Sequence, residues 1–252
     1  MQENSTFIMR TAVNGTKKVV TGAVTLLYIN QGQAEVYAFG RQYSAGYGSV
    51  FMLFDGEFCE VSSRSAIITT LNFDRKILSA DTLRLAFDIQ NRAVALMDEG
   101  VERFTDYITA LSGTSRLKEL ENTVTDKLLY CLLAEVKCAI KLGYSLPEEP
   151  LSKAVYFMTE NTLSAKKLSD IAEFAGVTVN YLCALFKGKT GVSCNKYIKR
   201  LKLRYAEFLL LTTTLSVKEV SDKCKYLSFS HFMSDFKEEL SLTPNAYKKL
   251  YE

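Results

Sequence analysis

The sequence predicts an α+β fold of two domains, a small β-barrel with attached helices followed by an all-α domain. Three observations predict it. Residues 19–73 alternate short apolar runs with glycines, which is typical of strands joined by tight turns. Beyond about residue 79, apolar side chains recur at helical spacing. The stretch 143–150 holds two of the chain's three prolines, and a helix cannot run through it, so we expect domains at 1–146 and 147–252.

The barrel is expected over about residues 1–78. The run VTLLYI at 24–29 is rich in β-forming residues, the sequence at 30–33 is a turn signal, and a second run follows at 34–39. Glycines stand beside the next apolar runs, where they supply backbone conformations that other residues resist. Short strands at such close turn spacing favour a barrel or a sandwich.

Helices are expected over about residues 79–142. In the stretch 81–111, helical spacing is carried by Leu85, Ile89, Ala93 and Leu96. A second helix, over 115–142, has a wide apolar face that runs from Leu117 to Ile140. That face packs either on the domain's own sheet or on the same helix of a second copy, and both interpretations stay open. The candidates for the dimer contact are Leu120, Val124, Leu128, Leu132 and Val136.

Composition argues against several classes of protein. No run of about 18 uninterrupted apolar residues predicts a membrane span, and the start, MQENSTFIMR, lacks a signal-peptide pattern. No two of the six cysteines form a C-x-x-C pair. His231 is the single histidine, which excludes histidine-rich metal sites and Ser-His or Cys-His dyads elsewhere. We therefore expect a cytoplasmic protein that is not an enzyme, with no catalytic residues, no metal and no cofactor.

Charge is unevenly distributed along the chain. Residues 1–150 hold 15 Lys and Arg against 18 Asp and Glu, a net charge of −3, whereas residues 151–252 hold 16 against 10, a net charge of +6. An acidic first part and a basic last part indicate two tasks, with a polyanionic partner at the C-terminal end.

The C-terminal domain contains an internal repeat. Residues 177–197 (VTVNYLCALFKGKTGVSCNKY) and 227–247 (LSFSHFMSDFKEELSLTPNAY) align without a gap at an offset of fifty. Repeats of this kind indicate duplicated supersecondary units. Thr178 and Ser228 are expected to cap helices through their hydroxyls, with apolar side chains following at helical spacing. Upstream, 168–176 predicts a short helix that ends in glycine, so each unit has the helix-turn-helix layout.

Residues 151–250 resemble the DNA-binding domain of the AraC/XylS family of transcription regulators. The matching stretches are LSDIAEFAGVTVNYLCALFKGKTG, YIKRLKLRYAEFLLLTTTLSVKEVS and LSFSHFMSDFKEELSLTPNAYKK, with Gly191, the pair Thr243-Pro244 and Tyr247 at characteristic places. The stretch YINQGQAEVYAFGRQYSAGYGSVFMLFDG, residues 28–56, is similar to the cupin-type barrel that is the family's usual partner domain. The barrel is therefore expected to be cupin-like, without the histidine ligands of metal-binding cupins.

The resemblance implies a bacterial, sequence-specific DNA-binding regulator, more commonly an activator, that acts with RNA polymerase and is nucleoid-associated when bound to promoter DNA. It also implies a homodimer. Several virulence-associated members of the family have short N-terminal domains like this one. The alternative from another class is a cupin-type small-molecule-binding protein or enzyme.

The second helix of each unit is expected to enter the major groove. The base-contacting candidates are Val179, Asn180, Cys183, Ala184, Lys187, Phe229, Ser230, His231, Met233 and Ser234. The candidates for the DNA backbone are Lys189, Lys196, Lys199, Arg200, Lys202 and Arg204. Cys183, Ala184 and Ser234 stand where the family often has arginine or glutamine, which favours A·T-rich sites and recognition of DNA shape. Lys225 stands where the family commonly has glycine, so the second turn is expected to adapt.

Three roles are open for the N-terminal domain. It binds a small effector of the fatty acid or sugar class, with Arg10, Lys17 and Lys18 as candidates to pair with a carboxylate. It is a dimerisation module without a ligand. Or it receives an anti-activator or another signalling protein.

Overall fold

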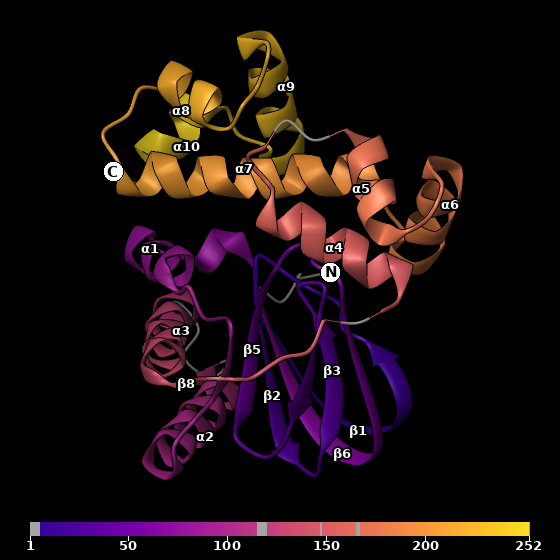
Figure 1. Cartoon of the computed structure of the whole chain (residues 1–252). Helices are drawn as coiled ribbons and strands as arrows, with labels where there is room; N and C mark the ends of the chain where they lie inside the picture. The colour runs from indigo at the N-terminus through magenta and orange to yellow at the C-terminus, as the bar shows by residue number, and fades with distance from the viewer. Residues whose placement is uncertain (1–5, 115–119, 147, 165–166, 252) are drawn as a thin grey trace. The chain divides into compact units, whose positions relative to one another are not determined.

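Strands come first along the chain and helices last, which confirms the α+β class (Figure 1). The structure, a computed structural model, describes residues 6–114, 120–146, 148–164 and 167–251. Its contacts divide the chain into two compact units. The N-terminal unit holds the chain up to Ala38 together with Gln42–Ser145, and the C-terminal unit holds Phe39–Arg41 together with the chain from Leu146 onward.

One curled sheet forms the body of the N-terminal unit (Figure 1). Its longer strands are β1 (Thr6–Lys18), β2 (Val24–Gln31), β3 (Ala34–Ala38), β4 (Arg41–Ala45), β5 (Ser49–Phe54) and β6 (Cys59–Phe73). The strand β6 is the organising one, because β1, β2 and β3 all pair with it in antiparallel register. The sheet follows the order β4-β3-β6-β2-β5-β7-β8, with β1 also on β6, and its twist curls it into a half-barrel.

Two short strands extend this sheet from within the region expected to be helical. The elements there are α1 (Ala80–Asp88), β7 (Ala93–Ala95), α2 (Asp98–Ser112), α3 (Glu121–Cys138) and β8 (Ile140–Lys141). The prediction of helix through Ile89, Ala93 and Leu96 is therefore wrong. Ile89 is the extended C-cap of α1, and Ala93 pairs with Phe51 of β5. Backbone pairing with the sheet determines the structure of this segment. The helical spacing of four apolar residues is a weak signal, because such intervals also occur by chance in buried segments.

The helix α3 packs mainly on its own unit. Leu132 and Val136 are buried at 0% and 1% exposure, so the prediction that they contact a second copy is corrected. Val124 and Leu128 are half-buried, and Leu120, which precedes the helix, is 61% exposed. Leu117 lies outside the described residues, and Ile140 belongs to β8 rather than to a helix.

Helices joined by short turns make up the C-terminal unit from Leu146 onward. They are α4 (Pro150–Glu160), α5 (Leu168–Ala175), α6 (Val179–Thr190), α7 (Cys194–Thr212), α8 (Val217–Lys223), α9 (Phe229–Leu240) and α10 (Pro244–Leu250). Pro150 begins α4, a position where its missing N–H is harmless. The 19-residue helix α7 is the longest, and it packs against α6, α8, α9 and α10.

None of the helices within the described residues is long and apolar enough to cross a membrane. No group of three or more His, Cys, Asp or Glu side chains within the same ranges is placed to hold a metal ion.

Candidate nucleic-acid interface

The first helix-turn-helix consists of α5, a tight turn and α6. Gly176 ends α5 in the left-handed conformation, with φ at +72°. The Gly176 N–H donates to the Glu173 carbonyl at 3.0 Å and the Val177 N–H donates to the Ala172 carbonyl at 2.9 Å, which is a Schellman turn. The Thr178 hydroxyl then accepts from the Tyr181 N–H at 3.3 Å and caps α6, as predicted.

The second helix-turn-helix consists of α8, a turn and α9. The same two bonds recur one by one: the Lys225 N–H donates to Asp222 at 3.0 Å and the Tyr226 N–H donates to Ser221 at 3.2 Å. Lys225 itself takes the left-handed conformation, with φ at +56°. The lysine therefore adopts the backbone conformation that glycine favours at this position.

The second turn is one residue longer than the first. The cap residue Thr178 is the second residue after Gly176, whereas Ser228 is the third residue after Lys225. Ser228 is the residue before α9, but its hydroxyl makes no capping bond, which corrects the prediction for that side chain. Its backbone, at φ −135°, lies away from the −75° at which Thr178 caps α6.

The fifty-residue repeat is a repeat of packing as well as of sequence. Phe186 lies edge-on against Tyr197 with ring centroids 5.4 Å apart, and Phe236 lies edge-on against Tyr247 at 5.5 Å. All four rings are buried. The cap before α7, Ser193 to the Lys196 N–H at 3.3 Å, recurs before α10 as Thr243 to the Ala246 N–H at 3.2 Å.

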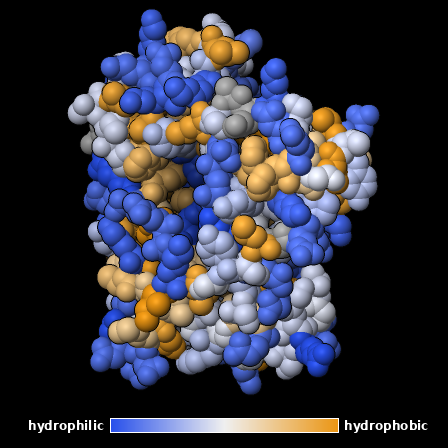
Figure 2. Space-filling model, viewed as in Figure 1, coloured by the Kyte–Doolittle hydropathy of each residue, from blue (hydrophilic) through white to orange (hydrophobic). Residues whose placement is uncertain are grey.

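All ten base-contacting candidates lie on α6 or α9, and none of them is buried. The exposed ones are Asn180, Ala184, Lys187, Phe229, Ser230, His231 and Ser234, and the half-buried ones are Val179, Cys183 and Met233. Cys183 lies beside the buried thiol of Cys194, whose pKa burial and this neighbour raise to about 12. Figure 2 shows hydrophilic residues over much of the drawn face of the C-terminal unit, with hydrophobic ones scattered among them.

Sequence reasoning missed Tyr181, which is 55% exposed on α6. Tyr181 occupies the position that His231 occupies on α9, fifty residues later. The repeat therefore contained the signal, because an outward position in one unit predicts an outward position in the other. Two further exposed residues were missed in the second unit: Lys237, equivalent to Lys187, and Leu227, which projects from the longer turn.

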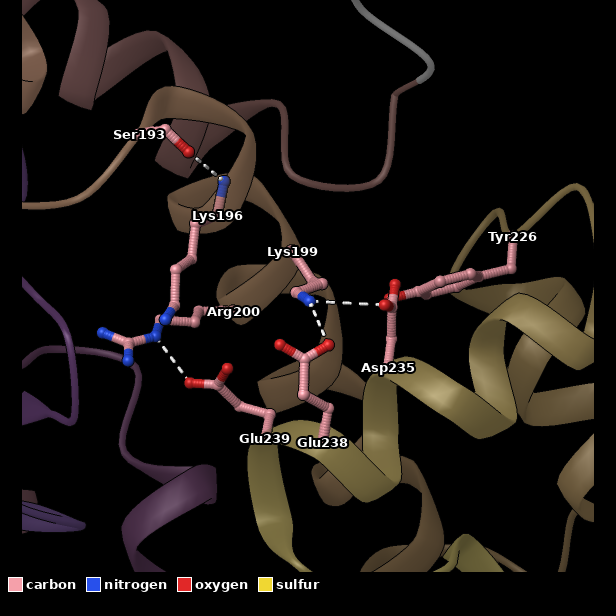
Figure 3. Close-up of polar contacts among 8 residues, drawn as sticks. All are labelled: Ser193, Lys196, Lys199, Arg200, Tyr226, Asp235, Glu238 and Glu239. Atoms are coloured by element: carbon pink, nitrogen blue, oxygen red, sulfur yellow. Dashed lines mark hydrogen bonds and ion pairs between the residues drawn. The ribbon is translucent and has the colours of Figure 1, made fainter.

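Two of the candidates for the DNA backbone contact acidic side chains of α9 (Figure 3). Lys199 Nζ lies 3.3 Å from Asp235 Oδ1 and 3.1 Å from Glu238 Oε2, and Arg200 Nε lies 2.5 Å from Glu239 Oε1. In the described structure these two cations therefore have carboxylate partners on α9.

The other four backbone candidates have different surroundings. Lys189 and Lys196 are exposed at the end of α6 and the start of α7. Lys202 Nζ lies 5.9 Å from the centre of the Tyr226 ring, and Arg204 is half-buried on α7.

The pKa values of two residues are shifted at this contact between α7 and α9. Burial lowers the pKa of Lys199, but hydrogen bonds to Glu238 and Asp235 outweigh burial and leave that pKa above its ordinary value. Burial, followed by the nearby charge of Asp235, raises the pKa of the Tyr226 hydroxyl, which donates to Asp235 at 3.3 Å.

The effector candidates all lie within β1. Arg10 and Lys18 are exposed, and Lys18 lies 6.0 Å from the Phe58 ring. Lys17 is half-buried and donates to the Thr11 hydroxyl at 3.0 Å. The structure does not bring these three side chains together around one site.

Comparison with known proteins places the C-terminal unit in a family. A helix-turn-helix domain family matches residues 171–250. The xylose operon regulatory protein of Escherichia coli K12 is 30% identical over 104 residues, which are 41% of this chain and 26% of that protein's length.

Two solved structures are also similar to this chain. An AraC-type regulator from Chromobacterium violaceum is 30% identical and covers 40% of this chain and 91% of its own, with a TM-score of 0.39. A variant of ToxT from Vibrio cholerae is 14% identical over 99% of both chains, with a TM-score of 0.41. The duplicated geometry and the sequence match together identify the C-terminal unit of this chain as a helix-turn-helix domain of the AraC/XylS family.

Proposed function

We propose that this chain is a DNA-binding transcription regulator that reads two segments of the major groove, one with α6 and one with α9. A single observation carries the proposal. Two helices fifty residues apart have the same Schellman turn before them and the same buried aromatic pair behind them, and both have exposed residues in their first turns, Asn180 and Tyr181 in α6 and Ser230 and His231 in α9. Such second helices present their N-terminal residues to base edges.

The reading faces favour A·T-rich DNA. Neither α6 nor α9 contains an arginine, the residue that most often binds guanine in the major groove. Asn180 is exposed and has the paired donor and acceptor that match adenine. Phe229 and Ala184 offer apolar surface to thymine methyl groups.

Phosphate contacts in this proposal come from exposed lysines in the last turns of α6 and α9 and at the start of α7. These are Lys187, Lys189, Lys196 and Lys237. Such contacts supply most of the affinity without sequence preference and weaken it as salt rises.

The remaining parts of the proposal concern the whole protein. The chain acts as a homodimeric activator with RNA polymerase in the cytoplasm, and the N-terminal unit controls it. The control is exerted by a small effector of the fatty acid or sugar class or by a partner protein. The exposed Leu120 and the half-buried Val124 and Leu128 on α3 support a surface for a second copy.

The test is selection of duplexes from a random library by the full chain, followed by titration of the selected duplex. Replacement of Asn180 by alanine should weaken binding by about 5- to 150-fold, the equivalent of one good base contact. The matched control is Asn14→Ala, an exposed asparagine on β1, which should bind as the wild type does. A wild-type chain that enriches no sequence would contradict the proposal, and an unchanged affinity of Asn180→Ala would contradict the assignment of that residue.

A further inference from the structure

The helix α7 packs on the first recognition helix, α6, and follows it closely along the chain. Only three residues separate the two helices, and Tyr197 of α7 packs on Phe186 of α6 within the buried core. The position of α7 therefore reports the position of the first reading face.

The second recognition helix, α9, is tied to α7 by all three of its acidic residues. Asp235 and Glu238 bind Lys199, and Glu239 binds Arg200, so two cations of α7 and three carboxylates of α9 all lie within ion-pair distance of an opposite charge (Figure 3). We call this set of five residues the α7–α9 bridge. The acids lie in the last two turns of α9, behind the N-terminal residues that are exposed for reading.

The pair of Arg200 and Glu239 is the shielded part of the bridge. Arg200 and Glu239 are 21% and 15% exposed, so water and salt screen this pair less than an ordinary surface pair. The Tyr226 hydroxyl donates to Asp235 and Lys202 lies over the Tyr226 ring, which connects the turn before α9 to the same network. Charge pairs of this kind contribute little net stability but are specific for one arrangement.

We propose, on the basis of the proposed function, that the α7–α9 bridge fixes the spacing of the two recognition helices and thereby selects the spacing between the two DNA segments. Lys199 and Arg200 are positioning residues in this account and make no phosphate contact. Three carboxylates around the two cations also disfavour an approaching phosphate by like-charge repulsion. On one face of a duplex, successive major-groove segments lie about 10 base pairs apart, so a rigid pair of helices accepts one spacing.

The experiment compares the selected duplex with versions that carry one base pair more or fewer between its two segments. The full chain is used as wild type, as Arg200→Glu, as Glu239→Arg and as the double charge exchange. The wild type should prefer the native spacing by about tenfold or more, the loss expected when at least one base pair is misread. Each single variant should lose most of that preference, and the double exchange should restore it.

A phosphate role for Arg200 gives a different pattern, which would overturn the proposal. Arg200→Glu would then weaken all spacings alike, lower the salt dependence by about one phosphate, and gain nothing from Glu239→Arg. The milder Glu239→Gln covers the case in which a charge reversal impairs folding, and it too should reduce the spacing preference. Hydrogen exchange of the α9 amides, measured on the full chain without DNA, tests the bridge separately. The exchange should be faster in Glu239→Gln than in the wild type. An unchanged exchange rate would refute the bridge even if the chain binds DNA. A wild-type chain that selects no duplex while α9 exchange does accelerate refutes the proposed function instead.

Discussion

The two helix-turn-helix units share one layout but differ in how their backbones achieve it. The first uses glycine at both left-handed positions, Gly176 before α6 and Gly191 after it. The second uses Lys225 before α9 and Ser241 after it, with φ at +56° and +59°. A side chain in this conformation costs about 1–2 kcal/mol relative to the right-handed region.

The turn of the second unit also lacks the side-chain cap of the first. Ser228 makes no capping bond, whereas Thr178 caps α6. The acids of α9 bind α7, and the Tyr247 hydroxyl donates to the buried Glu207 of α7 at 3.0 Å. The first unit packs instead on α4, where the centre of the Phe174 ring lies 4.9 Å from the centre of the Phe157 ring. The comparison teaches that the two copies of a duplicated motif can use different contacts to reach the same layout.

The largest effect should come from the buried aromatic pairs, where the two units are alike. Phe186→Ala and Phe236→Ala each remove a fully buried ring and should each lower the free energy of unfolding by about 3–5 kcal/mol. Urea unfolding followed by circular dichroism measures both. If the loss of unfolding free energy in one variant were more than twice that in the other, the two units would not be equivalent in their cores.

A smaller effect should separate the turns. Gly176→Ala should lower the free energy of unfolding by about 1 kcal/mol or slightly more, because a Cβ there meets nothing within 4 Å and only the backbone conformation opposes it. Lys225→Gly should have the opposite sign and a smaller size, since glycine also gains freedom in the unfolded chain. Thermal unfolding of the two variants checks the signs, and a destabilised Lys225→Gly would show that the lysine makes contacts that matter more than its φ.

The motif was predictable from the sequence because its spacing reports packing directly. Phe186 and Phe236 recur with Tyr197 and Tyr247 at the same interval, and each pair is one aromatic contact in the fold. Outward positions next to such a core, as at Asn180, follow from helix geometry alone.

The role of Lys199 and Arg200 could not be predicted in the same way. Periodicity shows which face of α7 carries these cations, but their partners lie 36 to 39 residues further along the chain. Which acids meet which cations depends on how α9 packs on α7, and that is a tertiary property. The strand β7 was missed for a related reason. Its three residues are too few to show an alternation of apolar and polar side chains, and only its pairing with β5 defines it as a strand.

Removal of single methyl groups from DNA should sharpen the comparison at the reading faces. Replacing thymine by uracil in the segment bound by α9 should weaken wild-type binding by about fourfold per contacted methyl, the equivalent of about 0.8 kcal/mol. Phe229, 44% exposed at the start of α9, is the expected partner, so Phe229→Ala should abolish the sensitivity in that segment and leave it intact in the segment bound by α6. A uracil duplex that binds both proteins as thymine does would contradict the apolar contact.

The smallest expected effect is a change of stability with pH. It tests whether the capping box at the start of α8 compensates for the strained turn that follows this helix. Glu219 accepts from the Ser216 hydroxyl at 2.6 Å and from the Ser216 N–H at 2.8 Å, and these bonds lower the pKa of Glu219 below its ordinary value of 4.5. Because the folded pKa is the lower one, the stabilisation is complete above pH 4.5 and is lost as pH falls through the folded pKa.

Wild type should therefore be more stable than Glu219→Gln near neutral pH, and the difference should shrink as urea titrations are taken below pH 4.5. Ser216→Ala, which removes the first bond, should reproduce part of that change. Parallel pH dependences of wild type and Glu219→Gln would mean that α8 gains nothing from this capping box. Compensation for the strained turn would then come from other contacts of α9, among them the α7–α9 bridge.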